Sequence, residues 1–194
     1  MVRTVSFVAI AFPLLACLTG GEPPGEYYGT YEITGVLLEN QCGAGVPALN
    51  PFSFKVELRT DGSAALWRRP QAPLTYGIVR DGVWEIDTSA TLPVYEADPI
   101  AGTPGCALTQ TESIVLEELE MDLDTAMPDG AMPDAAMPDA GAHNAMSGTT
   151  TITYTPTPGS DCSPSLVTFG GPFDSLPCAL RYELSVAPAE PIFE

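Results

Sequence analysis

Cysteine is the residue type in this chain with the clearest chemical consequence. The chain holds five cysteines in 194 residues, and none are spaced as the C-x-x-C pair of a metal or redox site. One is Cys17 near the N-terminus, and the other four lie in the body of the chain at Cys42, Cys106, Cys162 and Cys178. An even set of well-separated cysteines is typical of disulfide bonds in exported proteins. We therefore expect two disulfides from these four cysteines, with no metal site and no cofactor.

Other residue types leave little room for catalysis. His143 and Lys55 are the single histidine and the single lysine of the chain, which removes most histidine-based triads, histidine-ligated metals and lysine nucleophiles. The serines lack the G-x-S-x-G turn of hydrolases. Carboxylates are numerous but no active-site pair stands out, and the adjacent Glu117 and Glu118 would point to opposite faces of a strand. We predict no catalytic residue and a non-enzymatic protein, with a carboxylate-dependent hydrolase as the enzymatic alternative.

The charge balance excludes one class of partner. The chain has 25 acidic residues against 7 basic ones, which gives a formal net charge of -18. Such a surface repels phosphate backbones, so nucleic-acid binding through a basic face is excluded. The length and the apolar content of 45% allow a single domain with a filled core.

The N-terminus indicates where the protein is sent. Residues 1–16 place one early cation, Arg3, before an apolar run that is too short to span a bilayer, which predicts a signal peptide. The run ends in the letters LLAC at residues 14–17, which resembles the lipobox of bacterial lipoproteins. That resemblance implies that Cys17 becomes the first residue of the mature chain and carries acyl chains that bind a membrane. Residues 17–26 would then include a flexible spacer rich in glycine and proline.

The resemblance to lipoproteins also implies a location. In Gram-negative lipoproteins an aspartate after the lipidated cysteine signals retention in the inner membrane, whereas this chain has Leu18 there. We therefore expect a protein of the bacterial cell envelope, anchored in the outer membrane. A lipobox, a low-complexity segment rich in proline, aspartate and alanine, and a cysteine-stapled β domain together are similar to uncharacterised lipoproteins of myxobacteria and their relatives. This likeness implies no particular activity.

The elements that must position these residues are predicted to be β-strands. Polar and apolar residues alternate through residues 52–58, which is typical of a strand with one buried and one wet face. There we expect Phe52, Phe54, Val56 and Leu58 to be buried, and Lys55 and Glu57 to be exposed. Similar alternation or short apolar runs predict strands at 31–37, 64–68, 74–79, 83–88 and 178–186. Aspartate followed by glycine at 61–62 and 81–82 supplies the tight turns between them.

The segment between residues 114 and 155 changes character twice. In residues 114–123 the apolar positions shift from even to odd numbers after Glu117, which predicts a β-bulge in one long bent strand. An amphipathic helix is the alternative. The letters AMPD then repeat at 126–140, so we expect residues 125–147 to be a disordered insertion at a hairpin tip. The strand pattern resumes at 148–155, and residues 27–194 form a single domain.

The strand count is about eight, which predicts an all-β fold: an antiparallel up-and-down meander that closes, or nearly closes, into a barrel. A two-sheet sandwich is the alternative. In such a meander all four body cysteines fall on one rim. Counting along the hairpins favours the pairs Cys106 with Cys162 and Cys42 with Cys178. The local pair Cys162 with Cys178, leaving Cys42 with Cys106, stays open.

A second resemblance concerns the first and last strands. Gly29-Thr30-Tyr31 is loosely similar to the G-x-W of lipocalins, and Arg181 is placed where it could mimic the arginine that caps their tryptophan. Large inward side chains nevertheless indicate a filled barrel. Our hypothesis is therefore a lipid-anchored, non-enzymatic scaffold or partner-binding β domain, held to the membrane through Cys17. A lipocalin-like carrier of a small apolar ligand is the alternative.

Overall fold

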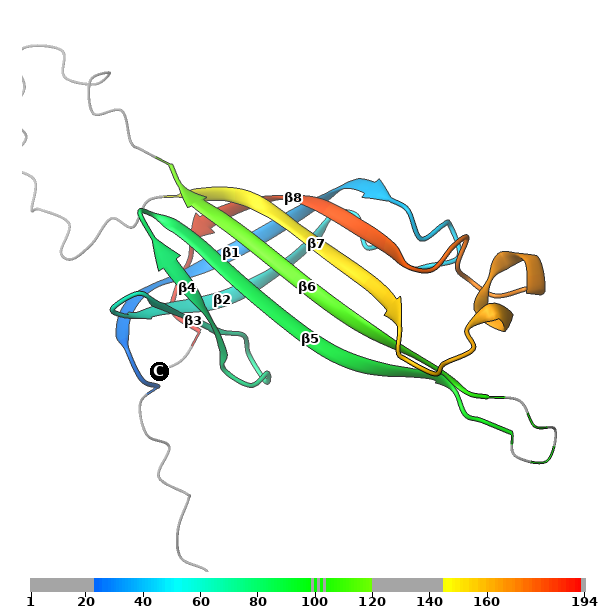
Figure 1. Ribbon diagram of the computed structural model, residues 1–194. Helices are drawn as coiled ribbons and strands as arrows, with labels where there is room; N and C mark the ends of the chain where they lie inside the picture. Colours follow the sequence, from blue (N-terminus) through cyan, green and yellow to red (C-terminus); the bar gives the residue numbers. More distant parts are fainter. Residues whose placement is uncertain (1–22, 99, 101, 103, 120–144, 193–194) are drawn as a thin grey trace, which may run out of the picture.

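The computed structural model describes residues 23–98, 100, 102, 104–119 and 145–192, which form one closed antiparallel β-barrel. Its eight strands follow one another in chain order around the barrel (Figure 1). They are β1 (Glu26–Asn40), β2 (Phe52–Asp61), β3 (Ala64–Arg68), β4 (Thr75–Arg80), β5 (Val83–Tyr95), β6 (Cys106–Glu118), β7 (Met146–Pro156) and β8 (Cys178–Pro188). Two short 3-10 helices, η2 (Ser163–Ser165) and η3 (Val167–Phe169), lie between β7 and β8.

The way the sheet closes confirms the predicted meander and rules out the two-sheet sandwich. Strand β1 pairs with β2 along one edge and with β8 along the other, so that Ile33 lies opposite both Phe54 and Val186. Each strand therefore has a hydrogen-bonded neighbour on both sides, and closure leaves no free edge strand as a site for edge-to-edge aggregation. Within the described residues, no helix reaches the length and apolar character that crossing a membrane requires.

Strand β6 corrects two expectations for residues 114–123. Residues 114–118 are strand and not helix, and the strand ends before Leu119. The bulge expected after Glu117 is also wrong, because the pairing with β7 continues unshifted through Glu118 opposite Met146. The pattern misled because Glu118 occupies an inward position, where its carboxylate accepts a hydrogen bond from Trp84 Nε1 at 3.5 Å. Residues 120–123 lie outside the described residues.

The start of β7 shortens the predicted insertion. Met146 and Ser147 belong to the strand, and Met146 is buried. Met146 lies directly after the polar repeat, so the sequence pattern assigns it to the repeat. In the structure its side chain packs inside the barrel. Most of the predicted insertion, with His143 in it, lies outside the described residues, and the same is true of residues 1–22.

Strand β2 confirms one half of its predicted pattern and corrects the other. Val56 and Leu58 are fully buried, Phe52 and Phe54 are half-buried against the core, and Lys55 is exposed. Glu57, however, is buried with only 5% of its surface exposed, although it points to the outer face. Its carboxylate pairs with Arg59 Nη1 at 3.2 Å and lies 4.0 Å from Arg68 Nη1.

A short N-terminal segment covers this outer face of β2 and β3. Arg59 donates from Nη2 to the carbonyl oxygen of Gly25 at 2.8 Å and from Nε to that of Pro24 at 3.2 Å. Gly25 also lies against Leu66, because a Cβ built on Gly25 would stand 2.6 Å from Leu66 Cδ1. Arg59, held by Pro24 and Gly25, and Arg68 of β3 therefore surround Glu57, and alternation within β2 could not reveal these contacts.

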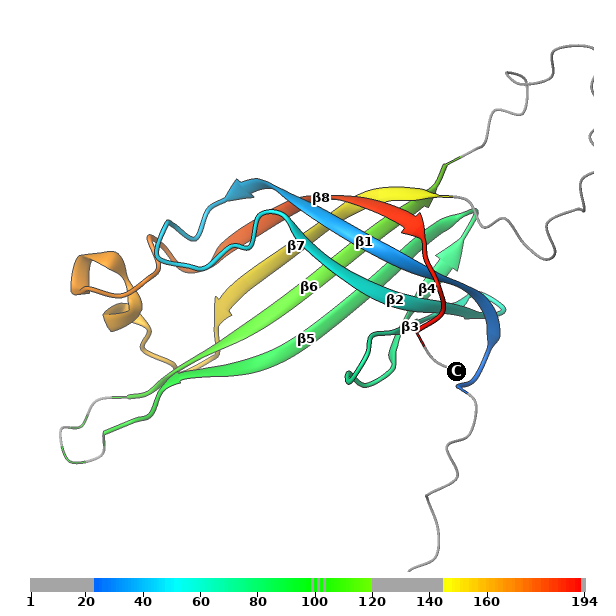
Figure 2. The same ribbon diagram turned by 180° about the vertical axis from the view of Figure 1, so that it is seen from behind.

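The barrel has two different ends, which Figures 1 and 2 show from opposite sides. The hairpin end carries the tight turns of β2–β3 and β4–β5 together with the start of β1 and the end of β8. The disulfide end carries the longer connections 41–51, 69–74 and 157–177. Between the two ends, inward side chains fill the barrel. The largest that are fully buried include Trp84, Tyr31, Ile33, Leu58, Ile86, Leu108, Ile114, Leu116, Met146, Leu180 and Leu184.

Candidate functional site

Two disulfides fasten the connections at the disulfide end. Cys42 is bonded to Cys178, and Cys106 is bonded to Cys162, each with an S–S length of 2.04 Å. These are the pairs that the meander register favours, and the local pairing of Cys162 with Cys178 is wrong. The reason is geometric. Cys42 just after β1 meets Cys178 at the start of β8 because these neighbouring strands close the barrel.

The connection from β7 to β8 folds over the disulfide end. Phe173 of this connection is buried, and its ring lies 5.9 Å from the ring of Tyr154, an inward residue of β7. The backbone N–H of Asp174 donates to the carbonyl oxygen of Cys42 at 2.8 Å, which joins this connection to the one after β1. The disulfide end is therefore a packed surface and not an open mouth at this position.

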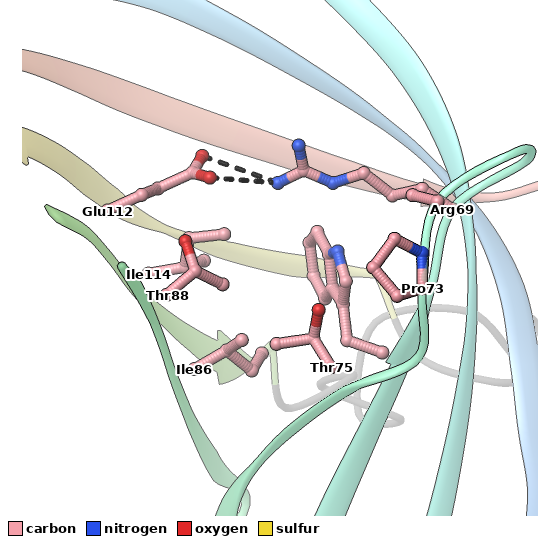
Figure 3. A pocket seen from close by; sticks show the side chains of 9 residues that line it. Arg69, Pro73, Thr75, Ile86, Thr88, Glu112 and Ile114 are labelled. Carbon is pink, nitrogen blue, oxygen red and sulfur yellow. Dashed lines mark hydrogen bonds and ion pairs between the residues drawn. The ribbon is translucent and has the colours of Figure 1, made fainter. Parts of the chain in front are cut away.

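A cavity of about 120 Å³ enters the barrel beneath the connection from β3 to β4 (Figure 3). Strands β3 and β4 have only 5 and 6 residues, whereas β5 and β6 have 13 each, so the barrel wall stops short on this side. The lining residues are Trp67, Arg69, Ala72, Pro73, Thr75, Ile86, Thr88, Glu112 and Ile114.

An ion pair spans the cavity. Arg69 donates from Nη2 to both carboxylate oxygens of Glu112, at 3.2 and 3.3 Å, and Figure 3 shows the two side chains reaching toward each other. The guanidinium also lies over two aromatic rings, 4.4 Å from the centroid of Phe54 and 5.3 Å from that of Trp67. Charge pairing and ring stacking together hold Arg69 in place and neutralise the inward carboxylate.

Two phenols on the inner faces of β7 and β8 have raised pKa values. Burial raises the pKa of Tyr154 above its ordinary value, and the negative charge of Glu112 raises it further. Burial also raises the pKa of Tyr182, and the nearby Tyr154 makes a smaller contribution in the same direction. The lining of the cavity itself offers an apolar floor, two threonine hydroxyls and the paired charges of Arg69 and Glu112. That chemistry suits a small neutral group.

The residues singled out from the sequence fall in different places. Cys17 lies outside the described residues. Trp84 and Tyr31 are buried in the core, whereas Trp67 lines the cavity. Arg181 is exposed on the outer face of β8, so the similarity to the arginine that caps the lipocalin tryptophan does not extend to its position. Arg181 lies between the inward residues Leu180 and Tyr182, and successive side chains of a strand point to opposite faces, so Arg181 points outward.

The cavity residues Arg69 and Glu112 were not expected from the sequence. Glu112 did carry a signal, because it shares the even-numbered phase of Ile114 and Leu116, and a carboxylate in a core phase requires a partner. Arg69 lies just beyond β3, where no alternation points to a face. Among the residues with described positions, no group of three or more histidine, cysteine or acidic side chains could hold a metal ion.

Comparison with known proteins adds no relative: no family model, curated protein or solved structure matches this chain.

Proposed function

We propose that this chain is a lipid-anchored protein of the bacterial cell envelope whose β-barrel works without catalysis, as a scaffold or as a binding domain for a protein partner. In this proposal Cys17 carries the lipid, and the outer membrane is the site of anchoring. The barrel then supplies a stable shape close to the membrane surface.

The observation that carries the proposal is the filled interior. Side chains from all around the barrel meet at its centre, and Trp84, Ile86 and Leu116 are among the fully buried ones. The cavity beneath β3–β4 has about 120 Å³, whereas sites for small molecules and cofactors usually have about 300 to 1,000 Å³. Because side chains fill the interior, a partner can contact only the outer face of the barrel and the connections between its strands.

The anchoring part of the proposal rests on the residues at 14–17, which resemble a lipobox. Expression of the full chain in a Gram-negative host with a fatty-acid analogue should label the protein and direct it to the detergent phase. Cys17→Ala should abolish the label, while Cys42→Ser with Cys178→Ser should retain it. An unlabelled wild-type chain would contradict the anchoring proposal.

The partner-binding part needs a separate test. Photo-crosslinking residues placed one at a time on the outer face and on the disulfide end should give discrete adducts in the native host when they face a partner. Exposed positions such as Phe169 and Ile78 are suitable sites, since both side chains are accessible. Absence of adducts from every exposed face would contradict a partner-binding role.

A carrier of a small ligand is the second candidate, and the cavity itself is the observation in its favour. Its apolar floor and its ion pair would accept a group of a few heavy atoms. Titration with small amides and alcohols, followed by tryptophan fluorescence, tests this because Trp67 lines the cavity. Saturable binding that Glu112→Gln weakens would move the carrier ahead of the partner binder.

A further inference from the structure

The outer face of β4 differs from the polar outer faces expected of a barrel in water. Tyr76 and Ile78 point outward there, with 62% and 39% of their surfaces exposed. They lie two residues apart on one strand, so their side chains stand next to each other. An exposed aromatic residue beside an exposed branched residue marks a candidate interaction surface.

The neighbouring strand provides an acidic wall. Glu85 of β5 lies opposite Ile78, and Asp87 follows two residues later on the same face. Together with Tyr76 and Gly77, these residues line an open hollow of about 270 Å³ on the surface of the barrel. We call this hollow, lined by Tyr76, Gly77, Ile78, Glu85 and Asp87, the β4–β5 cup.

Among the residues that the structure describes, no ion pair involves Glu85 or Asp87. The cross-strand neighbours of Glu85 are Ile78 on one side and Val115 on the other, and Ser113 lies opposite Asp87. Arg59, Arg68 and Arg69 form ion pairs away from the cup, with Glu57 and Glu112. The nearest cation along β4 is Arg80, which is exposed on the same face two residues beyond Ile78 and lies opposite Val83 at the hairpin turn.

The chemistry of the cup matches a cation on an apolar stem. An aromatic ring attracts an ammonium or guanidinium group, two carboxylates pair with it, and a branched side chain packs against the methylenes behind it. Lysine and arginine side chains combine these features. The hollow has room for one such side chain but lies below the usual size of a drug-sized site.

We propose that the β4–β5 cup binds a protein partner by receiving one of its lysine or arginine side chains between Tyr76 and Ile78 on one wall and Glu85 and Asp87 on the other. This inference rests on the proposed partner-binding function and names the chemistry of the partner. The net charge of -18 on the chain supports a basic partner, because it attracts cations and repels acidic proteins.

A direct test uses the full mature chain in neutral detergent and a fluorescent, capped peptide in which arginine alternates with threonine. The same peptide with neutral citrulline in place of arginine is the ligand control. Glu85→Gln combined with Asp87→Asn should weaken binding about tenfold, and Tyr76→Ser should weaken it about threefold without any change of charge.

The matched control removes the same charge elsewhere. Glu183 and Glu190 are exposed on and after β8, so Glu183→Gln with Glu190→Gln removes the same two negative charges at a distant place. This variant should bind the peptide within about twofold of the wild type. Equal losses in the two double variants, or wild-type binding by Tyr76→Ser, would overturn the cup as the seat of the cation.

Crosslinking in the native host separates failure of the cup from failure of the proposed function. A photo-crosslinker at position 78 should give an adduct that excess arginine peptide suppresses. Adducts from position 169 at the disulfide end but not from 78 would overturn the cup and leave partner binding in place. Absence of adducts at both positions would overturn the cup, and absence from every other exposed face as well would overturn partner binding.

Discussion

At the residue scale, the molecule depends on a few polar groups that are buried with partners from elsewhere in the chain. Glu57 and Arg59 lie on the outer face of β2, yet their side chains are only 7% and 8% exposed. Arg59 joins Glu57 to the backbone of Pro24 and Gly25. Removing one partner of a buried pair leaves the other charge without compensation.

Arg59→Met should therefore lower the free energy of unfolding by about 3 kcal/mol, because Arg68 at 4.0 Å compensates Glu57 only in part. Urea denaturation measures the loss. Lys55→Met, an exposed change on the same strand, should stay within about 0.5 kcal/mol of the wild type. A loss as small as that of the control would show that the pair carries no net stability.

Tyr28 gives the stability a dependence on alkaline pH. Burial raises the pKa of its phenol above the ordinary 10.0, and the hydrogen bond to Glu118 and its charge raise it further. The folded state therefore holds this proton more tightly than the unfolded state. The resulting stability is complete below pH 10 and falls as the pH rises above it, because the unfolded chain ionises first.

Urea midpoints measured between pH 8 and pH 11 should fall above pH 10 in the wild type, and less steeply in Tyr28→Phe. Tyr76→Phe is the matched control, because it removes an exposed phenol. Tyr31 has a raised pKa of its own from burial, so part of the slope should remain. An unchanged slope in Tyr28→Phe would contradict this account.

At the element scale, the two disulfides act on loops of different length. Cys42 and Cys178 are 136 residues apart, and Cys106 and Cys162 are 56 apart. A crosslink removes more entropy from the unfolded chain when the loop that it closes is longer. The two bonds should therefore differ in their contribution to stability.

Replacing either pair by serines should cost roughly 2 to 4 kcal/mol, with the larger loss for Cys42 and Cys178. Thermal unfolding without reductant compares the two variants. The reverse order would indicate that native packing at Phe173 and the β7–β8 connection, and not loop closure, decides the contribution.

The junction of β6 and β7 gives a second prediction at this scale. Deleting residues 125–144 leaves every described residue in place and should change stability by less than about 1 kcal/mol, since loop-closure entropy varies only logarithmically with length. Extending the deletion to 147 removes Met146, which is 1% exposed, and should cost about 2 to 5 kcal/mol more. Equal stabilities of the two deletions would contradict the assigned start of β7.

At the scale of the whole molecule, the chain has 25 acidic residues and only 7 basic residues. Like charges on a compact surface repel one another, and expansion on unfolding relieves the repulsion. Salt should therefore stabilise the fold by about 1 kcal/mol between low and physiological ionic strength. Melting temperatures in sodium chloride and potassium chloride should rise equally. A fall with added salt would show that the ion pairs of Arg59 and Arg69 outweigh the repulsion.

The sequence by itself determined the β character and the strand order, and it favoured the disulfide pairs that the structure shows without excluding the local pairing. Alternation with a period of two, as in residues 52–58 and 178–186, is a local property that each strand carries by itself. Aspartate-glycine turns joined neighbours as antiparallel pairs, and the meander then placed Cys42 beside Cys178 at the closing seam. The lipobox resemblance is also a matter of sequence, and it stays a prediction.

Only the tertiary structure decided which polar residues are buried and where the surface is hollow. Glu57 pairs with Arg59, which Gly25 holds in place, and the partner of Glu112 is Arg69, 43 residues away. The β4–β5 cup likewise needs side chains of two strands in register. Burial and pairing of this kind depend on what lies on the neighbouring strand or above it. Alternation along one strand gives the phase of a side chain, but not what covers it.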